Sequence, residues 1–160
     1  MITGTTRLYA IIGDPIAHVR TPMVFNDYFL GRNIDAVCLP VLIGRDDLPR
    51  GWAGLKSIAN LDGFIVTAPH KAESARLCDK LEGDGVHTKV VNTVRREPDG
   101  SFSGTLLDGR GFVSGFGRRV SLRGAVKREK LTFAAEWHKF QILPDHLDLR
   151  KRIAIDELLK

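Results

Sequence analysis

Strand-like and helix-like patterns alternate along the first 120 residues of the chain. Three runs rich in β-branched and aromatic residues predict buried strands, at residues 7–12, 35–43 and 63–67. Apolar residues at helical spacing predict a helix after each of them, at residues 22–31, 46–60 and 71–81. Repeated alternation of this kind is typical of an α/β fold, here a three-layer α/β/α arrangement around a mostly parallel sheet.

A hairpin is predicted after the third helix. The segment 97–100, Glu-Pro-Asp-Gly, is a strong turn signal, and it separates predicted strands at 90–96 and 101–107. The hairpin adds one antiparallel strand to the otherwise parallel sheet. Another helix is predicted to begin at Asp108 and to run toward residue 120.

Residues 121–160 differ in character from the part before them. Three basic residues between 127 and 130 precede four apolar residues on one helical face, Phe133, Ala134, Trp137 and Phe140. Pro144 ends this predicted helix, and residues 147–159 predict another. We therefore expect one domain over residues 1–120, followed by a helical or poorly ordered extension over residues 121–160.

Composition narrows the classes of function. The chain is 43% hydrophobic and 27% charged, as soluble globular proteins are, with no signal-peptide core and no apolar run of membrane-spanning length. Its two cysteines form no Cys-x-x-Cys pair, which indicates reduced thiols in a cytoplasmic protein. The net charge of +5 suits an anionic small-molecule substrate and is too diffuse to indicate nucleic acid. We expect a cytoplasmic protein with neither nucleic-acid nor membrane partners, and a homodimer is compatible with the sequence.

Candidate site residues follow the predicted strands. Ligands of open α/β sheets bind beyond the carboxyl ends of the strands. The loops after the first and third strands and the end of the hairpin are therefore expected to meet at one rim. Together they would supply five polar side chains, Thr21, Thr67, Lys71, Asn92 and Asp108.

Lys71 stands where the third helix begins, at the positive end of the helix dipole. An anionic or hydroxylated ligand or a partner carboxylate would explain a lysine there, and so would a side chain that reaches into solvent. Lys71 and Asp108 can form an acid–base pair in which the carboxylate orients the ammonium. Asp108 can equally cap the helix that follows it. Asn92, in the middle of a predicted strand, faces either a neighbouring backbone or a ligand.

Other common site motifs are missing from the sequence. It contains no Gly-x-Gly-x-x-Gly, Walker or Gly-x-Ser-x-Gly motif, and the glycine pairs at 109–111 and 115–117 lack the third glycine. The five histidines show no metal-ligand spacing, so no metal site is expected.

Four segments, in order along the chain, resemble the motifs of the shikimate dehydrogenase family. They are residues 13–22 with Asn26, residues 63–71, residues 91–93 and residues 104–112. The resemblance covers residues 7–116 and implies the N-terminal, substrate-binding domain of that family. The reaction it implies is the NADP-dependent interconversion of 3-dehydroshikimate and shikimate.

The resemblance also implies roles for individual residues. Lys71 and Asp108 would be the catalytic pair that moves a proton at the substrate oxygen. Thr67 and Asn92 would contact substrate hydroxyls. Val19 and Thr21 stand where the family has two serines that bind the substrate carboxylate.

The chain departs from the family pattern at three places. Val19 replaces one serine, Ile65 replaces an asparagine, and two leucines at 106–107 replace an Asn-Thr pair. Each lost charge-assisted hydrogen bond costs about 1.5–3 kcal/mol of binding free energy. We therefore expect a divergent member of the family, with shikimate, quinate or another hydroxylated ring acid as substrate.

Two functions stay open at this point. The family's nucleotide-binding domain is expected soon after Phe116, and residues 121–160 lack its strand and glycine fingerprint. The chain is either the substrate domain of an NADP-dependent dehydrogenase, inactive without a cofactor half, or a stand-alone metabolite-binding or regulatory module. Lys71 and Asp108 favour the enzyme, because a sensor needs no proton-transfer pair. A non-functional remnant, the third interpretation, would not unfold cooperatively.

Overall fold

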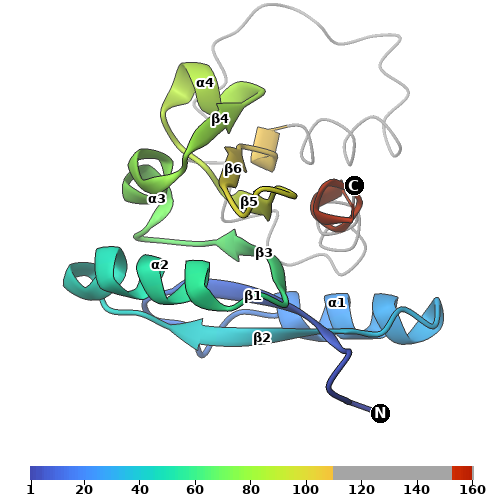
Figure 1. Cartoon of the computed structure of the whole chain (residues 1–160). Helices are drawn as coiled ribbons and strands as arrows, with labels where there is room; N and C mark the ends of the chain where they lie inside the picture. The colour runs from blue at the N-terminus through green and yellow to red at the C-terminus, as the bar shows by residue number, and fades with distance from the viewer. Residues whose placement is uncertain (110–152, 160) are drawn as a thin grey trace, which may run out of the picture.

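The computed structural model describes residues 1–109 and 153–159, which form a six-stranded sheet with helices on both faces (Figure 1). The strands are β1 (Arg7–Gly13), β2 (Ala36–Leu42), β3 (Leu61–Val66), β4 (Lys80–Glu82), β5 (Thr93–Arg96) and β6 (Phe102–Thr105). The helices are α1 (Thr21–Gly31), the short 3-10 helix η1 (Arg45–Asp47), α2 (Leu48–Ser57), α3 (Lys71–Leu77) and α4 (Asp84–Thr88). Residues 153–158 are also helical. None of the helices in residues 1–109 and 153–159 could span a membrane.

The sheet has the strand order β2-β1-β3-β5-β6-β4. β1 pairs in parallel with β2 and β3, and β6 pairs in parallel with β4. β5 runs antiparallel to both of its neighbours, β3 and β6. The predicted α/β fold, with a mostly parallel sheet and one antiparallel hairpin strand, is confirmed.

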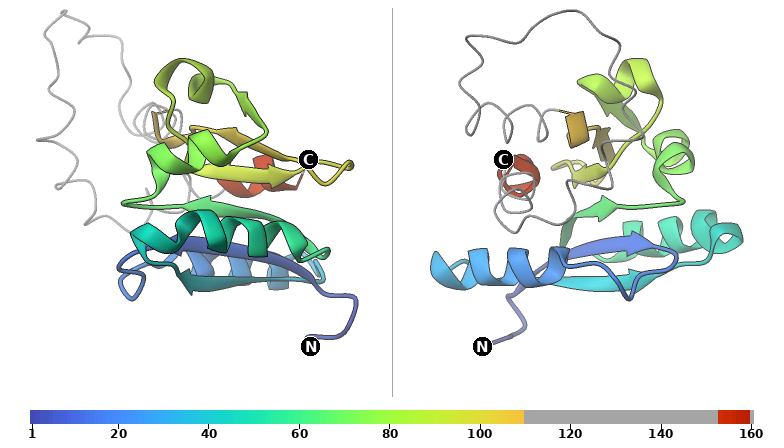
Figure 2. Two further views of the ribbon diagram at one scale, coloured as in Figure 1. Left: turned by 60° about the vertical axis from the view of Figure 1, so that its left-hand side comes forward. Right: turned by 180° about the vertical axis from the view of Figure 1, so that it is seen from behind.

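Each face of the sheet has its own apolar cluster. α2 and α3 cover one face, where Trp52, Phe64 and Phe102 meet edge to face with ring centroids 5.1–5.7 Å apart. α1 and the helical residues 153–158 lie on the other face, as the two views of Figure 2 show. There Phe29 packs with Ile155, which is fully buried.

The helix predicted over residues 71–81 is wrong beyond Leu77, where α3 ends. Asp79 turns the chain into the short strand β4 beside β6. Its backbone N–H donates to the Phe102 carbonyl at 2.9 Å, and its carboxylate accepts from the Phe102 N–H at 2.7 Å. These bonds to a distant strand outweigh the local helical pattern. The strand predicted over 90–96 likewise begins only at Thr93.

Residues 110–152 lie outside the described residues. They include most of the predicted extension and the continuation of the helix predicted to begin at Asp108.

The carboxylate of Asp79 makes the stability of the fold depend on pH. The Lys56 ammonium, 2.7 Å away, and the Phe102 N–H lower the pKa of Asp79 in the folded chain. Because the folded-state pKa is the lower one, this stabilisation is present above the unfolded pKa and is lost as pH falls through the folded pKa. We expect Asp79→Asn to lower the free energy of unfolding near neutral pH, with the difference from wild type shrinking as pH falls below about 4 and vanishing below the folded-state pKa of Asp79. Urea unfolding of wild type and Asp79→Asn at a series of pH values measures the two free energies of unfolding. A difference between them that stays constant at every pH would contradict this role of Asp79.

The open edge of β2 is closed by a side chain of α1. Asn26 Oδ1 accepts from the Cys38 N–H at 2.7 Å, and Asn26 Nδ2 donates to the Cys38 carbonyl at 3.1 Å. Pro40, two residues on, has no N–H to present. An exposed row of backbone groups invites pairing with another strand, so this arrangement keeps β2 as the last strand of the sheet.

Asn26→Ala is expected to lower the free energy of unfolding by about 1–3 kcal/mol, because it removes the amide partner of two backbone groups of the buried Cys38. Urea unfolding followed by circular dichroism measures the change. Asp27→Ala, one residue along on the exposed side of α1, is the matched control and should stay within about 0.5 kcal/mol of wild type. Equal stability of the two variants would show that Asn26 does not support the edge.

Candidate active site

The ends of three central strands and the segment before β5 meet at one rim of the sheet. After β1 and β3, the Thr67 N–H donates to the Ile12 carbonyl at 3.0 Å and the Asp14 N–H to the Ala68 carbonyl at 3.2 Å. Asn92 lies one residue before β5, so its predicted place in the middle of a strand is wrong. Its carbonyl accepts from the Val66 N–H at 2.8 Å and its N–H donates to the Thr105 carbonyl at 3.0 Å. These bonds fix the backbone of Asn92 between β3 and β6.

Lys71 and Asp108 meet at this rim. Lys71 is the first residue of α3, and its Nζ lies 2.6 Å from Asp108 Oδ2. The two side chains are 30% and 29% exposed, so the pair is reachable from solvent. The Lys71 backbone is held as well, because its carbonyl accepts from the Val91 N–H at 3.1 Å. Of the explanations for a lysine at a helix N-terminus, the partner carboxylate is therefore present.

Asn92 holds the other oxygen of the same carboxylate. Its Nδ2 donates to Asp108 Oδ1 at 2.7 Å, and the residue is 8% exposed. Both oxygens of Asp108 are thus bonded, one to a cation and one to a neutral amide. Of the two interpretations of Asn92 from sequence, the structure supports the bond to a neighbouring backbone, because Asn92 Oδ1 accepts from the Leu107 N–H at 2.9 Å. A contact between Asn92 and a ligand stays a prediction.

The remaining predicted residues lie around this centre. Thr67 follows β3, and its methyl group comes so close to Gly13, the last residue of β1, that a side chain at Gly13 would collide with it. Thr21 is buried at the start of α1, and Val19 is half-buried in the loop before it. In the described part of the chain neither Val19 nor Thr21 makes a side-chain hydrogen bond to Lys71, Asn92 or Asp108. The structure therefore joins three of the six predicted residues directly.

His70, which sequence reasoning set aside as a non-ligand, anchors the start of α3. It is 1% exposed, and its Nε2 lies 2.7 Å from the Ile43 carbonyl after β2. A carbonyl can only accept, so Nε2 carries the proton. The bond ties the residue before Lys71 to the end of a neighbouring strand. No spacing in the sequence signals this contact, because it joins loops 27 residues apart.

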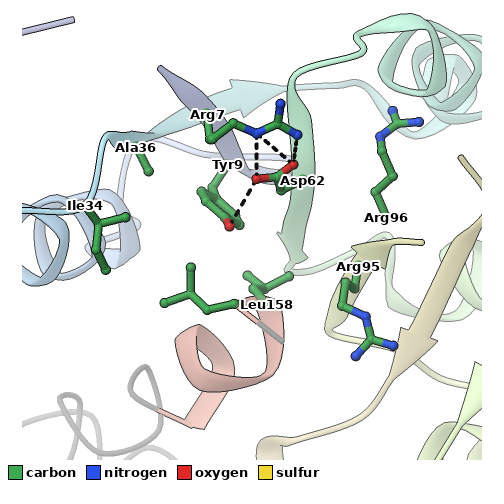
Figure 3. Close-up of a pocket in the computed structure, with 9 residues that line it drawn as sticks. Arg7, Tyr9, Ile34, Ala36, Asp62, Arg95, Arg96 and Leu158 are labelled. Carbon is green, nitrogen blue, oxygen red and sulfur yellow. Dashed lines mark hydrogen bonds and ion pairs between the residues drawn. The ribbon is translucent and has the colours of Figure 1, made fainter. Parts of the chain in front are cut away.

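A cavity of about 360 Å³ lies at the opposite rim, where β1 and β3 begin (Figure 3). Its charged side chains are bonded within the chain, with Arg96 donating to backbone carbonyls such as that of Leu61 at 2.7 Å. Arg7 pairs with Asp62, and Arg95 pairs with Glu97 at 2.7 Å and with Glu157 at 3.3 Å. Burial and the Asp62 carboxylate raise the pKa of Tyr9, so its phenol stays neutral. None of the residues that line this cavity belongs to the Lys71 rim.

Comparison with known proteins identifies the family of the chain. The shikimate dehydrogenase substrate binding domain matches residues 11–94. The chain is 36% identical to a shikimate dehydrogenase (NADP(+)) of Geobacter metallireducens over 133 residues, which cover 78% of the chain and 46% of that protein. A second relative of that name, from Rubrobacter xylanophilus, is 36% identical over 112 residues, which cover 70% of this chain and 39% of that protein.

Solved structures give the same result. A shikimate dehydrogenase from Aquifex aeolicus superimposes with a TM-score of 0.71 at 30% identity, covering 76% of this chain and 45% of that one. A shikimate 5-dehydrogenase from Listeria monocytogenes, in complex with shikimate and NAD, superimposes with a TM-score of 0.69 at 32% identity. The match covers 73% of this chain and 40% of that one. The chain spans about half the length of these relatives or less. It belongs to the family of shikimate dehydrogenase substrate-binding domains.

Proposed function

We propose that the chain is the substrate-binding part of an NADP-dependent oxidoreductase that interconverts 3-dehydroshikimate and shikimate, or a related hydroxylated ring acid and its ketone. The observation that carries this proposal is the Lys71–Asp108 pair, with Nζ and Oδ2 at 2.6 Å and Asn92 on the second carboxylate oxygen. Such a pair is suited to proton transfer at a substrate oxygen.

In this proposal Lys71 is the general acid and base. When the ketone is reduced, its carbon gains a hydride and its oxygen gains a proton from the Lys71 ammonium; in the other direction the amine takes that proton back. An ammonium has three N–H donors, and Asp108 occupies one of them. The others are available to a substrate oxygen. Asp108 thereby orients the ammonium, and Thr67 beside it is proposed to bind a substrate hydroxyl.

The described residues do not form a binding site for NADP. They contain no strand followed by a complete Gly-x-Gly-x-x-Gly turn, the arrangement that places a dinucleotide on a helix N-terminus. Gly83 precedes α4 and Gly85 lies within it, but that helix has five residues and Thr88 stands at the third glycine position. We therefore assign to these residues substrate binding and proton transfer, and no part of hydride transfer.

The departures from the family pattern bear on the substrate. Ile65 packs against the apolar cluster of Tyr9, Phe29 and Leu107, so this position contributes apolar surface where the family has an amide. Val19 likewise offers no hydroxyl beside Thr21. With fewer polar groups available, we propose weaker binding of shikimate than a full ligand set would give, and quinate or a less hydroxylated ring acid as an alternative substrate.

Ligand titration of the ¹⁵N-labelled chain tests the proposal, with shikimate, quinate and NADP added separately. Saturable shifts with shikimate or quinate and none with NADP are expected. No saturable shift with either acid, in a well-dispersed spectrum, would remove the assignment. Binding that is unchanged in both Lys71→Ala and Asp108→Ala would favour the stand-alone metabolite-binding module instead.

A further inference from the structure

The hydrogen bonds at the Lys71 rim continue inward beyond Asn92. The Oδ1 atom of Asn92 accepts from the Leu107 N–H at 2.9 Å and from the Thr93 hydroxyl at 3.2 Å, and both bonds are buried. Thr93 is 1% exposed, within β5. A continuous series of bonds therefore runs from the sheet interior, through Asn92 and Asp108, to the Lys71 ammonium.

These inner bonds determine which way the Asn92 amide faces. A backbone N–H can only donate, so the amide oxygen must face Leu107 and the NH₂ group must face Asp108. An amide oxygen has two lone pairs, and the Thr93 hydroxyl occupies the second. Two donors on one oxygen fix the amide plane as well as its direction.

We propose that Thr93 is a positioning residue for the Lys71–Asp108 pair and acts through Asn92. This inference rests on the proposed function of that pair, although the bonds themselves do not depend on it. Thr93 reaches neither Lys71 nor a substrate, because its hydroxyl lies behind Asn92 in the sheet. Its contribution is to hold the Asn92 amide so that one N–H stays on Asp108 Oδ1.

The arrangement also limits what Asn92 can recognise. With both lone pairs of Oδ1 occupied and one N–H on Asp108, the side chain retains a single N–H. A substrate oxygen that faces Asn92 must therefore act as an acceptor. The proton of a substrate hydroxyl at that place has to be donated to another group.

The test compares Thr93→Val, which replaces the hydroxyl by a methyl group of similar size, with Thr93→Ser, which keeps it. In the ligand-free chain the NMR signals of the Asn92 side-chain NH₂ report the bond to Asp108. We expect hydrogen exchange of this group to be roughly fivefold faster in Thr93→Val, as expected for loss of one buried hydrogen bond, and to return to the wild-type rate in Thr93→Ser. Shikimate affinity should fall roughly three- to tenfold in the valine variant only.

Thr6→Val is the matched control, because Thr6 is also buried and its hydroxyl donates to a carboxylate, Asp35, at 2.7 Å at the opposite rim. It should leave the Asn92 signals unchanged. Unchanged Asn92 exchange in Thr93→Val, or an equal change in Thr6→Val, would overturn the proposal. So would loss of the fold in both Thr93→Val and Thr93→Ala, which would make Thr93 a purely structural residue. If the wild type binds neither shikimate nor quinate, the proposed function fails while the Asn92 signals still decide the role of Thr93.

Discussion

Gly63→Ala is expected to lower the free energy of unfolding by about 3 kcal/mol, the upper end of the usual cost of overpacking. Gly63 lies in β3, opposite Arg95 of β5, and faces the helical residues 153–158. A Cβ there would lie 2.5 Å from the Val94 carbonyl oxygen and 2.6 Å from Leu158 Cδ2. The side chain of Leu158 can turn away, but the Val94 oxygen belongs to the backbone of the neighbouring strand. Relief therefore requires β3 and β5 to move apart.

Urea unfolding followed by circular dichroism measures this loss. Gly54→Ala is the matched control, because Gly54 lies in α2 and a Cβ there would meet nothing within 4 Å. Removing a glycine from a helix interior should raise stability by roughly 0.5–1 kcal/mol. If Gly63→Ala instead matched wild type, the close approach of the β5 backbone to β3 at Gly63 would be contradicted.

Lys71→Ala is expected to weaken shikimate binding at least tenfold. A charge-assisted hydrogen bond contributes about 1.5–3 kcal/mol, which corresponds to roughly 10- to 150-fold in affinity. The change also leaves the Asp108 carboxylate without its cation, next to the proposed position of the substrate. Titration of the labelled variant with shikimate measures the dissociation constant.

Lys56→Ala is the control for that measurement. Lys56 is 35% exposed and pairs with Asp79 at 2.7 Å, so it closely resembles Lys71 in exposure and pairing but is not part of the Lys71 rim. Its replacement should leave shikimate affinity within about twofold of wild type while lowering stability slightly. Equal loss of affinity in the two variants would mean that the effect of Lys71 is an indirect one on the fold.

The sequence predicts the layout of the domain well because its strong patterns are local. The β-branched and aromatic run at 63–67 predicts a buried strand from neighbouring residues alone, and the turn signal at 97–100 predicts the hairpin of β5 and β6 in the same way. The short strand β4 was missed because Leu77 and Leu81 continue a helical spacing, whereas the bonds from Asp79 to Phe102 that end the helix are not local.

In the site, too, the features that follow from the order of the strands were predicted, and those that depend on individual side-chain contacts were not. The meeting of Lys71 and Asp108 follows from strand order and was predicted. The contributions of Thr93 and His70 were not, because each depends on which atom of a neighbour its side chain reaches. The packing of residues 153–158 against Tyr9 is equally invisible in the sequence, since the helical spacing there does not name the surface it covers. The functional roles of all six predicted site residues stay predictions.

The most direct test of the substrate site is to map where shikimate changes the NMR spectrum of the labelled chain. We expect the largest shifts in the side chains of Lys71 and Asn92 and in the backbone near Gly13 and Thr67, with saturation at millimolar or lower shikimate. The opposite rim, around Arg7 and Arg95, should not respond. Shifts centred on that rim, or none at Lys71 and Asn92 at saturation, would contradict the assignment of the Lys71–Asp108 pair as the place where substrate binds.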